Sequence, residues 1–332
     1  MANTLTYWRS LLPLLCLSTC VNTAQAVDPA LLAPAASRNL SPLYHSLGIP
    51  PLVGAQSIGA GNWQLDWSVH WASHALQEVS QGDLLELDGE TRRQDLRLRL
   101  GLTDRLTLTV NLPYLQHAGG QLDSLIDDWH SLWDMPDGPR ARQPRDALNF
   151  SFGGDPGFSV NNSRSGFGDA ELGLAMELLP GHSWQLAAFA RYKFDSGDAG
   201  DFTGSGDSGV ALGARLGREA CIFASLSCHM QIGIADVGDI AISGAAQQRV
   251  AFGGLALAWQ LLGSLALTAQ LDAHDVVYEQ APLNNSGAPV WGTLGLRWQP
   301  AERWFVEAQF SEDLAVGTAP DITFRLALSR RL

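Results

Sequence analysis

Apolar and polar residues alternate strictly over residues 62–73, which read NWQLDWSVHWAS. The three tryptophans of this stretch recur every four residues, a spacing that fits one face of either a helix or a strand. Leu65 and Val69 decide between the two, because they share the tryptophan face only if the period is two. The stretch therefore predicts a strand with one apolar face and one polar face.

The same alternation recurs along the chain and predicts about twelve strands. The other segments are 95–102, 106–112, 168–178, 184–194, 208–217, 229–235, 251–259, 264–273, 290–298, 304–310 and 322–332. The gaps between them alternate between short ones, such as 103–105 and 262–263, and long ones, such as 73–92 and 114–166. Tight turns at one end and long loops at the other are typical of outer-membrane barrels.

Composition favours a membrane barrel over a soluble β-sandwich or a soluble barrel. Only 17% of the 332 residues are charged, and the polar faces of the predicted strands carry Gly, Ala, Thr, Ser and Gln with scattered charges. A water-facing strand surface would be richer in Lys and Glu. We therefore predict an all-β fold, a transmembrane antiparallel up-and-down β-barrel of about 12 strands. The net charge of −13 argues against nucleic-acid binding, which needs a basic surface.

The first 26 residues have the features of a secretory signal peptide. Arg9 precedes an apolar run, and Ala24 to Ala26 supply small residues at the usual cleavage spacing. A lipoprotein signal ending at Cys20 is the alternative, although Thr19 fits that pattern poorly. The expected organisation is a signal peptide over 1–26, an N-terminal segment over 27–58 and the barrel over 59–332. The expected location is the Gram-negative outer membrane.

Two segments outside the strands are candidate plugs for the lumen. Residues 27–58 are rich in Pro and Ala and lack a period, so they form either a periplasmic tail or a plug inside the barrel. Residues 121–134 carry apolar side chains at helical spacing and predict an amphipathic helix in the long extracellular loop. This helix has three open placements: over the barrel mouth, inside the lumen, or on the outer leaflet.

Three stretches resemble markers of a Gram-negative outer-membrane family known as the domain-of-unknown-function family numbered 3187. They read SRNLSPLYHSLGIPPLVGAQ, LDSLIDDWHSLWDMPDGPRARQPRD and GFGDAELGL, and the likeness runs from about Arg38 to the C-terminus. The resemblance implies a barrel and supplies no activity. The chain departs from the usual barrel pattern in ending on Leu332 rather than on an aromatic residue.

Strand phase assigns the candidate functional side chains. The predicted lumen-facing, solute-contacting charges are Asp66, Arg97, Arg99, Glu171, Arg191, Lys193, Arg215, Arg297, Glu307 and Arg325. They either line a pore or pair with one another to fill a narrow barrel, and the excess of arginine favours anionic solutes if the lumen is open. The predicted membrane girdle consists of Trp63, Trp71, Trp184, Trp298 and Trp304. Cys221 and Cys228 span eight residues in an exported chain, which suggests a disulfide across a hairpin.

The leading functional hypothesis is a channel or binder for a small solute, gated by the N-terminal segment and the loop helix. The alternative is a closed structural or surface-interaction barrel without transport, and the third is a lipid-modifying enzyme that uses His70 or His130. The sequence shows no nucleophile elbow and nothing that orients a base, so no catalytic residue is assigned. No cofactor, metal or nucleic acid is expected. The expected partners are outer-membrane lipids and lipopolysaccharide, the barrel-assembly machinery and an unknown small solute.

Overall fold

The computed structural model describes residues 28–133, 143–155, 157–180, 183–241, 248–284, 287–315 and 317–332. The predicted signal peptide lies outside this range. Within it, no helix is both long enough and apolar enough to cross a membrane.

Twelve strands of the described chain form a closed antiparallel barrel, as the alternating pattern predicts. Each wall strand pairs with the next one in the wall, and the last strand returns to pair with the first. The wall strands are β1 (Trp63–Ser80), β2 (Asp83–Gly101), β3 (Leu106–Ala118), β7 (Glu171–Glu177), β8 (Trp184–Lys193), β9 (Gly209–Arg218), β10 (Leu226–Asp236), β11 (Arg249–Leu262), β12 (Leu265–His274), β13 (Val290–Ala301), β14 (Trp304–Asp313) and β15 (Ile322–Arg331). Leu332 exchanges backbone hydrogen bonds with Trp63, so the final residue completes the closure.

The outer face of this wall is apolar and the inner face is polar. Outward leucines such as Leu255, Leu294 and Leu326 keep 56%, 57% and 64% of their surface exposed. A belt of exposed apolar side chains all around a protein matches lipid rather than water. Of the ten charged residues assigned to the lumen, eight are buried, and Arg99 and Arg297 line the internal cavity.

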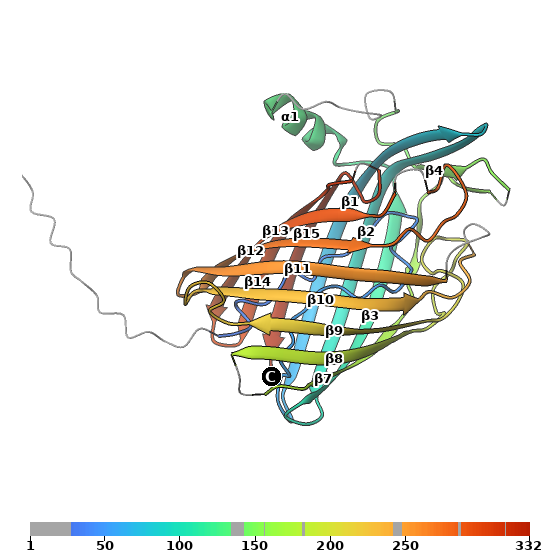
Figure 1. Ribbon diagram of the computed structural model, residues 1–332. Helices are drawn as coiled ribbons and strands as arrows, with labels where there is room; N and C mark the ends of the chain where they lie inside the picture. The colour runs from blue at the N-terminus through green and yellow to red at the C-terminus, as the bar shows by residue number, and fades with distance from the viewer. Residues whose placement is uncertain are drawn as a thin grey trace, which may run out of the picture.

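The segment 73–92 is not a loop, and that expectation was wrong. β1 and β2 continue beyond the rest of the wall and meet at Gln81 and Gly82, which both adopt positive φ angles (Figure 1). The alternation changes phase along β2. Leu96 and Leu98 face outward, whereas Leu85 and Leu87 are buried on the inner side. A sequence pattern that follows one continuous apolar face therefore assigns too few residues to β2.

The long connection between β3 and β7 holds the helix α1 (Asp123–Trp133) and three short strands. β4 (Asn149–Phe152) pairs with the upper part of β2, and β5 (Phe158–Val160) pairs with β4. β6 (Arg164–Phe167) pairs with the upper end of β3. These strands raise one side of the wall at the end that carries the long loops. That end is extracellular and the short-turn end is periplasmic in barrels of this class.

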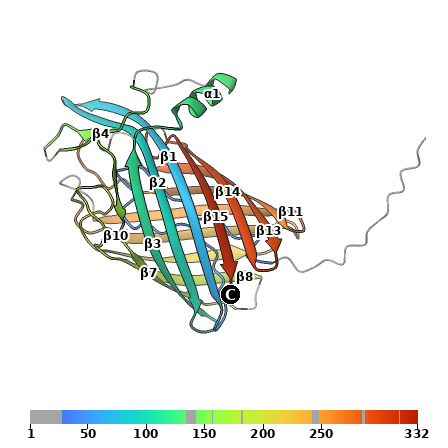
Figure 2. The ribbon, with the colours of Figure 1, turned by 180° about the vertical axis from the view of Figure 1, so that it is seen from behind.

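Helix α1 lies against the outside of the barrel, at the extracellular end (Figures 1 and 2). Leu122 and Ile126 pack against the outward-facing Trp71, Phe310 and Phe324. Of the three placements that the sequence leaves open, the lumen and the mouth are therefore wrong.

A buried carboxylate fixes the start of this helix. Glu90 faces outward from β2, yet it is only 1% exposed because the helix covers it. Its oxygens accept hydrogen bonds from the backbone N–H groups of Gln121 and Leu122 and from the indole of Trp71. The guanidinium of Arg92 stacks 4.2 Å from the Trp71 ring. A carboxylate suits a helix N-terminus, where free N–H groups and the helix dipole concentrate positive charge.

We predict that Glu90→Gln loosens α1 by about 0.5–2 kcal/mol, the usual range for losing a helix cap. Hydrogen exchange over residues 121–128 should rise, whereas the exposed control Glu302→Gln should leave it unchanged. Equal protection in both variants would contradict the capping role.

Depth along β1 generates a second prediction. Trp67 lies midway between Trp63 and Trp71 and is 50% exposed on the outer face. An arginine at the bilayer midplane costs about 2–4 kcal/mol, against about 0–1 near an interface. Trp67→Arg should therefore lower the heat stability of the barrel band on a denaturing gel more than Trp63→Arg does. Trp71 is a poor comparison, because its replacement would also disturb α1.

Candidate functional site

The N-terminal segment fills the lumen. We call residues 28–58 the plug, and almost every side chain from Leu31 to Leu47 is buried (Figure 1, blue). Its first described residue, Asp28, forms an ion pair with Arg331 at the end of β15, at 2.9 Å. The plug thus enters from the periplasmic end, and the sequence alternative of a periplasmic tail is wrong.

The plug has no regular secondary structure, so its backbone carbonyls need partners from the wall. Arg297 on β13 donates to the carbonyls of Ala30 and Ala33, both at 2.9 Å, and to that of Pro34 at 3.2 Å. His229 and Gln231 on β10 do the same for Leu32 and Pro50. The inward polar side chains therefore replace the backbone hydrogen bonds that a helix or sheet would supply.

One ion-pair network holds the middle of the plug. The guanidinium of Arg38 meets the carboxylate of Glu171 on β7 through two hydrogen bonds, of 3.2 and 3.0 Å. Arg191 on β8 reaches the same carboxylate at 3.0 Å. Burial lowers the pKa of Arg38 and Glu171 opposes that shift, so the pair stays charged. Asp95 joins the network through Arg93, which lies 3.0 Å from Asp95 and 4.0 Å from Glu171. Neither Arg38 nor Asp95 was identified from the sequence.

A buried apolar cluster closes the extracellular end, and we call it the cap. It combines side chains of the plug with others from β2, the short strands and the long loops. Its members include Leu43, Tyr44, Leu47, Leu85, Leu87, Phe150, Phe152, Val160, Phe202, Val237, Ile240, Val277, Tyr278 and Leu283. The Tyr278 hydroxyl donates to the Leu43 carbonyl at 2.6 Å. The plug is thus part of the cap.

The plug residue His45 lies beside the wall residue His117. Both its ring nitrogens are buried without a hydrogen-bond partner among the described residues, and its ring lies 5.3 Å from that of His117. Burial, with the nearby charges of His117 and Arg93, lowers the pKa of His45 well below its ordinary value. His45 is therefore neutral and acts as packing.

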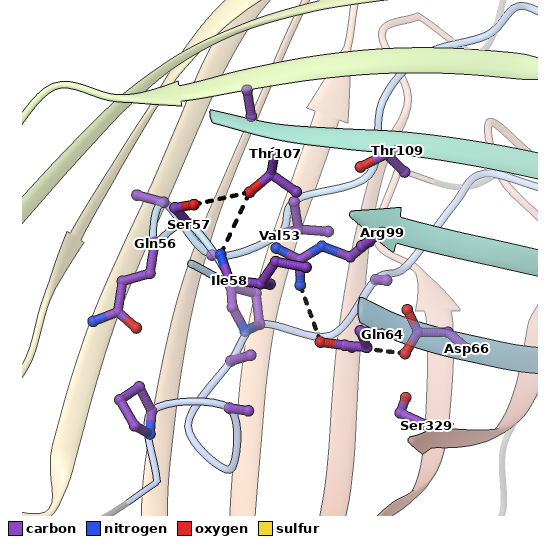
Figure 3. Close-up of a pocket in the computed structure, with 18 of the residues that line it drawn as sticks. Val53, Gln56, Ser57, Ile58, Gln64, Asp66, Arg99, Thr107, Thr109 and Ser329 are labelled. Carbon is purple, nitrogen blue, oxygen red and sulfur yellow. Dashed lines mark hydrogen bonds between the residues drawn. The ribbon is translucent and has the colours of Figure 1, made fainter. Parts of the chain in front are cut away.

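The periplasmic end of the lumen is open and contains a cavity of about 700 Å³, which we call the vestibule. Plug residues form part of its lining. Ser57 contacts Thr107 at 3.1 Å, and Arg99 donates to Gln64 at 3.3 Å (Figure 3). The ionisable side chains in the lining are Asp28, Asp66, Arg97, Arg99, Glu177, Arg191, Arg215, Glu219, His229, Arg297, Glu302, Arg303, Glu307, Arg325 and Arg331.

The predicted lumen residues fall into three groups. Glu307 bridges Arg297 and Arg325 near the periplasmic end. Glu171 and Arg191 hold the plug, and Lys193 pairs with Asp169 at 2.9 Å. Arg97, Arg99 and Arg215 form no ion pair with any described residue, although Asp66 lies opposite Arg97 in the register of β1 and β2. The sequence left open whether these charges pair with one another or line a pore. The structure shows both, since some of them form ion pairs and others face the cavity.

The side chains around His70 do not form a catalytic relay. Its Nε2 lies 3.4 Å from the Ser68 hydroxyl and 3.5 Å from the Asp95 carboxylate. A relay needs the nucleophile and the orienting acid on different ring nitrogens, and here both contact the same one. Ser68 and His70 are also buried beneath the plug, at 3% and 2% exposure. The side chain of His130 lies outside the described residues.

The remaining predicted residues are a cysteine pair and five tryptophans. Cys221 and Cys228 form the expected disulfide. Trp63, Trp184 and Trp298 are exposed on the outer face, at 45%, 44% and 49%. The predicted girdle also includes Trp71, covered in part by α1, and Trp304, over which Arg330 stacks. Their depth in a membrane stays a prediction.

Apolar outside, polar inside and closed by pairing of its first and last strands, this molecule is a transmembrane β-barrel with an internal plug. The chain belongs to the family described as "Protein of unknown function (DUF3187)", whose profile matches residues 10–332. That match confirms the resemblance seen in the sequence. None of the curated proteins compared with the chain matches it.

Solved structures share this fold. The chain is similar to the COG4313 outer membrane channel from Pseudomonas putida F1, with a TM-score of 0.59 and 15% identity over 84% of this chain and 98% of that one. A weaker likeness is to the NanC porin, with a TM-score of 0.46 and 8% identity over 81% of this chain and 100% of that one. At these identities the likeness concerns the fold.

The Arg38–Glu171 pair yields a prediction for plug stability. Glu171→Gln leaves two buried guanidiniums without their charge partner, a loss of about 3–5 kcal/mol for a buried pair. Because Arg38 is the one tryptic site between residues 28 and 91, cleavage there reports on plug release. Trypsin should cut Glu171→Gln at Arg38 faster than the wild type or Glu302→Gln. Wild-type resistance in Glu171→Gln would show that the pair does not hold the plug.

Proposed function

We propose that this protein is an outer-membrane channel or binding protein for a small solute, gated by the N-terminal plug. The observation that carries the proposal is how the plug is held. Much of its attachment consists of hydrogen bonds between wall side chains and plug carbonyls, rather than a continuous strand ladder. Water can replace such bonds one at a time when the segment moves. The vestibule already gives the periplasm access to the lower lumen.

The gate in this proposal is the plug alone. Helix α1 contributes to the outer wall and leaves the lumen to the N-terminal segment. Removal of the plug would also remove Leu43, Tyr44 and Leu47 from the cap. Movement of one segment would thus change both ends of the lumen together.

A closed structural barrel remains the second candidate, and one observation favours it. The cap is a large apolar cluster that draws on several loops as well as on the plug. If those loops keep their packing without the plug, the lumen stays shut.

Conductance across planar bilayers distinguishes the two candidates. We expect the full-length barrel to conduct rarely and a variant lacking residues 28–58 to conduct steadily. A folded deletion variant that is impermeable would remove the channel proposal. Heat-modifiable migration on a gel shows that the deletion variant has folded.

A tethered plug provides a test that does not depend on the deletion. The hydroxyl oxygens of Ser37 in the plug and Ser311 on β14 lie 3.4 Å apart. The double variant Ser37→Cys with Ser311→Cys should form a disulfide that abolishes the rare openings, and reduction should restore them. Each single variant controls for the effect of the reductant on the native Cys221–Cys228 disulfide. Openings that persist at the wild-type rate in the oxidised double variant would contradict plug gating.

A further inference from the structure

The vestibule contains positive charge that the protein itself does not balance. Three arginines of the lining have carboxylate partners, since Arg297 and Arg325 share Glu307 and Arg331 pairs with Asp28. Arg303 lies exposed at the rim. Arg97, Arg99 and Arg215 do not have such partners within 4.0 Å in the described part of the chain. We call these three the vestibule arginines.

The vestibule arginines lie on two separate strands of the wall and line one cavity. Arg97 and Arg99 lie on β2, whereas Arg215 lies on β9. All three side chains nevertheless line the vestibule. Like charges brought together in a partly enclosed space are unfavourable unless an opposite charge joins them.

The hydrogen bonding of these side chains is incomplete. Arg97 is 8% exposed, and its Nε is buried without a partner among the described residues. Arg215 is 7% exposed, stacks 4.0 Å from the Phe189 ring and donates its Nε–H to Gln231 at 2.8 Å. Stacking and that single bond fix the Arg215 guanidinium and leave its terminal N–H groups for another acceptor.

Among the described residues, the plug carbonyls bonded to the wall have other donors. Those of Ala30, Ala33 and Pro34 accept from Arg297, that of Leu32 accepts from His229, and that of Pro50 accepts from Gln231. Arg99 reaches the neutral amide oxygen of Gln64, and Asp66 accepts from the same glutamine at 2.8 Å (Figure 3). Asp66 is the one carboxylate facing the vestibule arginines from a neighbouring strand. Over the described lining as a whole, eight arginines stand against six side-chain carboxylates, which leaves an excess of two positive side chains.

We propose that the vestibule arginines form a binding site for a compact anion that carries carboxylate or phosphate groups and at least two negative charges. Guanidinium N–H groups match the paired oxygens of both groups, and the cavity of about 700 Å³ admits a small organic acid. The anion enters from the periplasmic end while the plug is in place. Binding needs no transport, and the claim that this anion is the transported solute rests on the proposed function.

Calorimetric titration of the full-length barrel in detergent tests the site, with citrate and inorganic phosphate as the probes. Chloride salt keeps the ionic strength constant, because exposed charges respond to salt in general. We expect saturable binding of one anion for each barrel. Arg97→Gln and Arg215→Gln should each weaken it about tenfold or more, as expected for the loss of a charge-assisted hydrogen bond. The triple glutamine variant should not bind.

Arg330→Gln is the matched control, since Arg330 faces outward and stacks over Trp304. It should bind both anions as the wild type does. Wild-type affinity in the triple variant, or no binding of either anion by the wild type, would overturn the site.

Thermal stability gives a readout that a merely structural role would not produce. Without anion, the triple glutamine variant should unfold at a temperature equal to or above that of the wild type, because a repulsion has been removed. Citrate should then stabilise the wild type and leave the triple variant unchanged. A triple variant that is unstable in both conditions would show that these arginines support the fold, which contradicts the proposal.

The two proposals fail separately. If the anion binds and the barrel lacking the plug is impermeable, the channel proposal is contradicted and the anion site is supported. If that barrel conducts with the same preference for anions over cations with and without the three arginines, the channel stands and the anion is not its solute.

Discussion

A chain segment without regular structure can be buried only where its backbone groups find hydrogen-bond partners, and this constraint shapes the lumen. The plug brings a series of carbonyls into the barrel. Wall side chains such as Arg297, His229 and Gln231 donate hydrogen bonds to them. An apolar lumen would leave those carbonyls unsatisfied at a cost of about 1–3 kcal/mol each. The polar inner face therefore follows from the plug as much as from any solute.

The size of the barrel is matched to this task. Eight strands leave an interior that side chains fill, and sixteen leave an aqueous channel. Twelve strands leave room for one chain segment at the extracellular end and a cavity of about 700 Å³ at the periplasmic end. The lumen charges also differ between the plugged part and the vestibule. Where the plug is present they are paired across it, as Arg38 is with Glu171. In the vestibule, Arg97, Arg99 and Arg215 form no ion pair within the described part of the chain.

The outer wall shows how one strand pattern can serve two environments. Along β2 the apolar side chains face outward at Leu96 and Leu98 and inward at Leu85 and Leu87, where the strand rises into the cap. Helix α1 then covers a small part of the outer face and buries Ile322 and Glu90, which strand phase alone would leave exposed. The outside of the barrel is thus not uniform, and its extracellular edge is reinforced by the longest loop.

The sequence by itself determined the wall. A period of two is a local property, so it assigned the twelve strands, the outward tryptophans and the inward charges before any contact was known. It also located the helix and the Cys221–Cys228 pair, because both depend on neighbours close in the chain. Only the tertiary structure decided where the plug lies, which arginines are compensated and on which side of the wall the helix packs. Those outcomes depend on contacts such as Arg38 with Glu171, 133 residues apart, and no local pattern encodes a partner at that distance.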